Sequence, residues 1–82
     1  MIVYHFIITL LWCWHDDEGE QQTMATISGL NAFDDFQSED VLYAHALDQA
    51  AFQCRAGSLG TDSEIPDRAA PFIMFYQCIL NE

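Results

Sequence analysis

The 82-residue chain is predicted to be a small α+β domain with the element order ββαβ. Three observations predict this. A run of β-branched and aromatic residues spans 2–14, apolar residues recur at helical spacing over 38–55, and a second apolar run covers 72–80. Three strands beneath one helix can enclose the single hydrophobic core for which a chain of this length has room.

The first strand is expected over residues 2–14, because large apolar side chains occupy its even positions. These positions form one continuous core face: Ile2, Tyr4, Phe6, Ile8, Leu10, Trp12 and Trp14. The run is shorter than the roughly twenty residues that a membrane span needs. It also lacks the positive charge with which a signal peptide begins, so we expect a strand of a soluble protein.

The acidic segment HDDEGE at 15–20 interrupts this pattern, and Gly19 favours a turn there. A second strand, QQTMATISGL, is expected over 21–30 and would form a hairpin with the first. The stretch NAFDDFQ at 31–37 is expected to be a loop.

The same acidic segment is a weak candidate for a metal site. Adjacent carboxylates such as Asp16 and Asp17 on a tight turn point in different directions and do not converge on one ion. An EF-hand loop counted from Asp16 would require Gly and Glu where the chain has Gln21 and Ile27. We therefore expect a solvated charged turn.

A helix is predicted from the N-cap residue Ser38 to about Arg55. Glu39 and Asp40 place carboxylates in its first turn, where they suit the positive end of the helix dipole. Gly57 fits the position just past its end. The residues expected to face the sheet are Tyr43, Leu47, Ala50 and Cys54, with Ala46 and Ala51 beside them.

Residues 57–71 contain several Gly and Pro residues and are expected to form a surface loop before a third strand at 72–80. A right-handed crossover through the helix requires the third strand to run parallel to the second. The first strand then lies in the middle, which gives a three-stranded sheet of order 2-1-3 with one helix packed on one face.

One helix leaves the other face of this sheet uncovered. Val3, Ile7 and Leu11 would lie on that face, together with half of the third strand. A sizeable exposed apolar patch marks an interaction site, so a homodimer or a bound partner is expected there.

The charge is strongly one-sided, with thirteen Asp and Glu, two Arg, no Lys and a formal net charge of −11. Binding to a phosphate backbone or to an anionic membrane needs clustered Lys and Arg, so neither nucleic acid nor a membrane is an expected direct partner. A basic protein is the natural partner, and opposite charge also speeds such an encounter.

Three well-separated cysteines, Cys13, Cys54 and Cys78, indicate buried free thiols in a reducing cytoplasm rather than a disulfide framework or a zinc site. Cys13 and His15 would share a strand face, but no third group follows at a spacing that would orient them. The other two histidines are isolated in the sequence: His5 and His45. We expect no enzymatic activity, no cofactor and no metal.

Two acidic clusters are candidates for partner binding. The first comprises Phe33, Asp34, Asp35, Phe36, Glu39 and Asp40. The second is the hairpin tip, with Asp16, Asp17, Glu18 and Glu20. For the first cluster, an equally good interpretation is that the Phe side chains plug the edge of the core while the carboxylates stay solvated. A third acidic loop contains Asp62, Glu64 and Asp67.

The chain resembles short acidic proteins of phages and prophages. The resemblance lies in its size, in the hairpin formed by YHFIITLLW and QQTMATISG, and in the single helix SEDVLYAHALDQA. It covers most of the chain and implies the activity of anti-CRISPR and anti-restriction inhibitors, several of which mimic DNA. It carries no site motif, so it assigns no role to any residue.

The sequence therefore predicts an acidic interaction domain that binds and inhibits a basic, nucleic-acid-binding protein, with its carboxylates imitating DNA phosphates. The alternative is a homo-oligomeric structural or accessory protein whose acidity serves solubility only. Salt separates the two, because binding led by charge weakens with ionic strength and apolar self-association does not.

Overall fold

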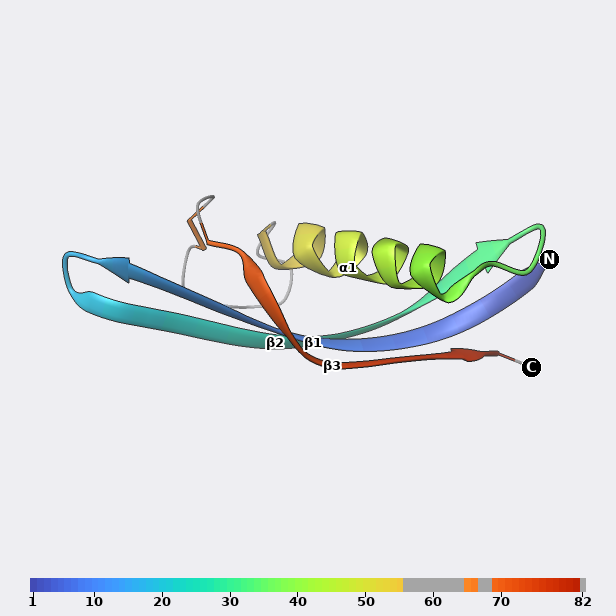
Figure 1. Ribbon diagram of the computed structural model, residues 1–82, viewed down its shortest axis with the longest axis horizontal. Helices are drawn as coiled ribbons and strands as arrows, with labels where there is room; N and C mark the ends of the chain where they lie inside the picture. Colours follow the sequence, from blue (N-terminus) through green and yellow to red (C-terminus); the bar gives the residue numbers. More distant parts are fainter. Residues whose placement is uncertain (56–64, 67–68, 82) are drawn as a thin grey trace.

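The computed structural model describes residues 1–55, 65–66 and 69–81 (Figure 1). Its elements are β1 (Ile2–Asp16), β2 (Gly19–Phe33), α1 (Glu39–Arg55) and β3 (Pro71–Leu80). The predicted order ββαβ is confirmed. The sheet order is β2-β1-β3, so β1 is the central strand, as the sequence predicted.

The hairpin of β1 and β2 is longer than predicted. The two strands pair from Ile2 opposite Phe33 to Asp16 opposite Gly19 without a register shift. Residues 31–33, which we expected in a loop, continue β2 because the start of β1 supplies their main-chain partners. The stretch expected to be a loop is therefore shorter than predicted.

β3 runs antiparallel to β1, from Leu80 opposite Tyr4 to Pro71 opposite Trp12, and is thus parallel to β2. Its register shifts once, opposite the step from Thr9 to Leu10 in β1. One extra residue in β3 at this point is a bulge, which bends an edge strand. Figure 1 shows β3 beside the central part of β1, with the tip of the β1–β2 hairpin extending beyond it.

The core lies between the sheet and α1. Buried even-numbered residues of β1 supply most of it: Tyr4, Phe6, Ile8, Leu10 and Trp12. Ile27 adds a buried side chain from β2, while Trp14 packs against the core only in part. The even face predicted from the alternation is confirmed, and its centre is completely enclosed.

The start of α1 matches the prediction. The Val41 amide lies 3.4 Å from the Ser38 hydroxyl oxygen, and the Leu42 amide donates to the Ser38 carbonyl at 3.1 Å. The buried stripe of the helix consists of Leu42, Ala46, Ala50 and Cys54. Tyr43 and Leu47, expected on this stripe, are only half-buried, because the helix is rotated so that small residues face the sheet.

The connection from α1 to β3 is not purely a surface loop. Ile65 and Ala69 are buried and belong to the same core as Trp12. These residues lie in a Gly- and Pro-rich segment whose apolar residues show no periodicity, so the pattern did not reveal them. The expected helix end at Gly57 and the acids Asp62, Glu64 and Asp67 lie outside the described residues.

Phe6 and Gly29 face each other across β1 and β2. A Cβ atom placed on Gly29 would lie 2.9 Å from two carbon atoms of the Phe6 ring, closer than side chains normally approach. The ring therefore covers the glycine backbone, and this close approach leaves no room for a side chain at position 29.

Candidate functional site

The sheet surface opposite α1 is uncovered by any described element, and we call it the open face. Its residues follow from the register: Val3, His5, Ile7, Thr9 and Leu11 of β1; Ala32, Leu30, Ser28, Thr26 and Met24 of β2; and Ile79, Gln77, Phe75 and Phe72 of β3. Apolar side chains on both edge strands are strongly exposed, among them Leu30 at 61%, Phe72 at 60% and Phe75 at 51%. The open face contains the predicted residues Val3, Ile7 and Leu11, and it is wider than they indicated.

The polar side chains of the open face include two pairs joined across β1 and β2. The His5 Nε2 atom lies 2.7 Å from the Ser28 hydroxyl oxygen, and the hydroxyl oxygens of Thr9 and Thr26 are 2.9 Å apart. Groups that already bond to one another lose less when water is removed. Between the rows of Val3 and Leu11, no residue of the open face is Asp, Glu, Lys or Arg, and the same side of the hairpin continues to Glu20 at its tip.

The hairpin tip is a charged turn, as the sequence predicted. Gly19 has a φ of +108°, which favours glycine, and no other described residue has a positive φ. An Asp16 carboxylate oxygen accepts a hydrogen bond from the Glu18 amide at 2.8 Å, which closes the turn locally. The carboxylates here, Asp16, Asp17, Glu18 and Glu20, are all exposed.

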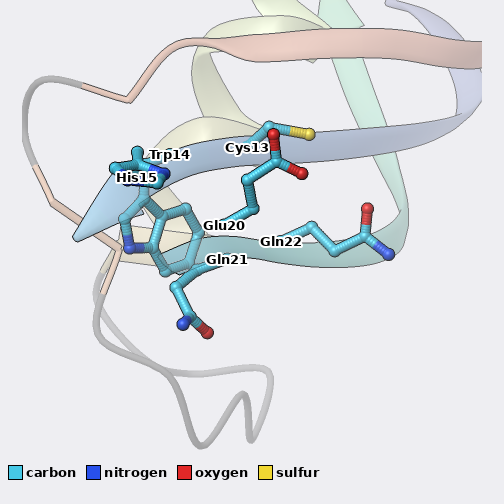
Figure 2. Close-up of a pocket in the computed structure, with 6 residues that line it drawn as sticks. All are labelled: Cys13, Trp14, His15, Glu20, Gln21 and Gln22. Carbon is cyan, nitrogen blue, oxygen red and sulfur yellow. The ribbon is translucent and has the colours of Figure 1, made fainter. Parts of the chain in front are cut away.

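A shallow hollow of about 660 Å³ lies next to this tip (Figure 2). It is lined by Cys13, Trp14, His15, Glu20, Gln21 and Gln22. The register places Glu20 opposite His15, so an acid, an imidazole and the Cys13 thiol project from one side of the ribbon. The sequence did not reveal this third group, because Glu20 belongs to the other strand.

The three titratable side chains of the hollow, Cys13, His15 and Glu20, are all exposed. The expectation of buried thiols holds for Cys54, holds only in part for the half-buried Cys78, and does not hold for the exposed Cys13. Among the described residues, no group of three or more His, Cys, Asp or Glu side chains could hold a metal ion.

The first acidic cluster lies where β2 leads into α1. Asp34, Asp35, Glu39 and Asp40 are exposed, and Phe36 beside them is 74% exposed. Phe33 behaves differently. Its ring centre lies 6.0 Å from that of Tyr4 and 5.2 Å from that of His45, both in edge-to-face contacts. Phe33 therefore plugs the edge of the core, and Phe36 is left as the exposed aromatic residue.

The two acidic clusters lie at opposite ends of an elongated molecule. The chain measures 48 × 21 × 17 Å, and Figure 1 shows the hairpin tip at one end and the β2–α1 connection at the other. The carboxylates therefore do not form one continuous row. The uncharged open face lies between them along the sheet.

No known protein family, curated protein or solved structure significantly matches this chain. Within the described residues, no helix has both the length and the apolar character needed to cross a membrane.

Proposed function

We propose that this chain is an acidic interaction domain that binds a basic, nucleic-acid-binding protein and blocks its nucleic-acid site. The observation that carries the proposal is the exposure of every described Asp and Glu side chain, in a chain with no Lys and a net charge of −11. A small domain remains soluble at a net charge of magnitude about 2 to 8, so this charge exceeds what solubility requires.

The arrangement of the carboxylates supports two contact points. The clusters lie at opposite ends of a molecule 48 Å long, which exceeds the roughly 34 Å of one turn of duplex DNA. A partner whose basic groups normally hold phosphates more than one turn apart would match both clusters. Phe36 adds an exposed aromatic side chain beside one cluster, which is a common anchor in protein interfaces.

Binding of this kind should depend on clusters rather than on single residues, because one exposed ion pair is worth only about 0 to 1 kcal/mol. The test uses two variants: D34N/D35N in the connection before α1, and D17N/E18Q/E20Q at the hairpin tip. Asp16, Glu39 and Asp40 are left intact, since they close the turn or suit the helix dipole.

The immobilised wild-type chain is incubated at low salt with a nuclease-treated lysate of its source cell, and retained proteins are identified by mass spectrometry. We expect basic nucleic-acid-binding proteins that elute as salt rises, and weaker retention on both variants. A retained protein is then purified, and its affinity for DNA or RNA is measured with and without the chain. Equal retention by all three chains, or unchanged nucleic-acid binding, would contradict the proposal.

The second candidate function is a homo-oligomeric accessory protein, and the open face favours it. Its apolar side chains provide an association surface that does not involve the carboxylates. Under this alternative, neutralising either acidic cluster does not weaken the association.

A further inference from the structure

The distribution of charge over the sheet distinguishes the open face from the rest of the molecule. The carboxylates of the described residues lie on the hairpin tip, on the β2–α1 connection and along α1, where the last is Asp48. The three strands carry none between the rows of Val3 and Leu11. In a chain with thirteen acidic residues, a neutral surface of this length is the region where a second chain of the same charge can approach.

The size of the open face is suited to association. At about 3.3 Å per residue and about 4.8 Å between strands, nine rows of three strands cover about 400 Å² in plan. Side chains that stand out of this plane raise the accessible area toward the roughly 800 Å² that each partner buries in a standard interface. Several of its exposed members are large apolar side chains, such as Leu30, Phe75 and Ile79.

We infer that the open face packs against the open face of a second copy of this chain. A basic partner would find no carboxylate to pair with on the open face. An identical open face carries no charge between the same rows, so two copies can pack together without leaving a charged group unpaired. A twofold interface uses the same patch on both subunits, which a self-complementary apolar face with internally bonded polar pairs satisfies. The two sheets would stack about 10 Å apart, as in a β-sandwich.

This association is independent of the proposed binding of a basic protein. Face-to-face packing leaves α1 on the outside of each subunit and places both acidic clusters at the ends of the sandwich. The two interactions also respond to salt in opposite directions. Salt screens the repulsion between two chains of charge −11 and strengthens the dimer, whereas it weakens the attraction between carboxylates and a basic protein.

The test compares F75K with F52K by sedimentation equilibrium. Both substitutions replace an exposed Phe: Phe75 lies on the open face and is 51% exposed, and Phe52 lies on α1 and is 74% exposed. Because the change in charge is the same, only the position differs. We expect wild type and F52K to reach twice the chain mass of 9.4 kDa. F75K should raise the dimer dissociation constant about 100-fold or more, since each subunit would bury an unpaired charge.

Two further measurements keep the result interpretable. L30K, on the other edge strand, should reproduce the effect of F75K if circular dichroism shows that F75K alters the fold. The oxidation of Met24, which is 61% exposed in the single chain, should slow relative to that of Met1 as protein concentration rises. A monomeric wild type up to millimolar concentration, or a dimer that F75K and L30K leave intact, would overturn the inference without affecting the test of the acidic clusters.

Discussion

The two faces of the sheet differ sharply in burial, although the same strands build both. Ile7 and Ile8 are neighbours in β1 with the same side chain, yet Ile8 is fully buried beneath α1 and Ile7 is half-buried on the open face. The open face is nearly as rich in apolar groups as the covered one. Hydropathy therefore does not decide which face becomes the core, and the placement of the single helix does.

The largest expected effect on stability is that of truncating Ile8, compared with the same truncation at Ile7. I8A should lower the free energy of unfolding by about 2 to 5 kcal/mol, because it leaves a cavity in a closed core. I7A should cost less than about 1.5 kcal/mol, since its surroundings are already partly solvated. Urea unfolding in the F75K background, where association is weakened, measures both. Equal losses would show that α1 does not distinguish the faces as described.

The contact between Phe6 and Gly29 gives the next largest effect. G29A should cost about 1 to 3 kcal/mol, because its Cβ would overlap the Phe6 ring at 2.9 Å. In the double variant F6L/G29A the smaller side chain removes the overlap. The two losses should then sum to more than the measured loss of the double variant. Strictly additive losses would indicate that Gly29 acts only through backbone flexibility.

The covered face should also change how stability depends on pH. Burial, assisted by the neighbouring Cys78 thiol, raises the pKa of Tyr76 from 10.0 to about 12, and burial raises the pKa of the Cys54 thiol. The unfolded chain loses these protons first, so stability is constant below the unfolded values and falls as pH rises through the folded ones.

Y76F isolates the tyrosine contribution to this alkaline loss. The Phe ring keeps the edge-to-face contact with Tyr43, whose ring centre lies 5.1 Å away. Chemical denaturation at a series of pH values should show a shallower loss between pH 10 and 12 for Y76F than for wild type. Parallel curves would mean that the Tyr76 hydroxyl is no less solvated in the folded chain than in the unfolded chain.

The smallest effect concerns the acidic ends, which belong to neither face. In the F75K background, added salt should raise the melting temperature by a few degrees, because it screens repulsion among exposed carboxylates worth less than about 1 kcal/mol each. D34N/D35N in the same background should reduce this salt dependence. A melting temperature that falls as salt rises would contradict the repulsion.

The sequence by itself determined the element order, the extent of α1 and the covered face of β1. Each rests on a local signal: the alternation from Tyr4 to Trp12, or the N-cap at Ser38. The sequence also indicated that one sheet face would lack a helix. These features were predictable because the spacing of apolar residues along a strand or helix indicates which of its sides is buried.

Tertiary structure decided the features that join residues far apart in the chain. Only the register of the hairpin places Gly29 under Phe6, Glu20 opposite His15, and residues 31–33 in the sheet. Only the packed core shows that Ile65 and Ala69 are buried, and only the length of the sheet separates the two acidic clusters. A local pattern cannot specify such partners, because the free energy of a long-range contact belongs to the pair rather than to either residue.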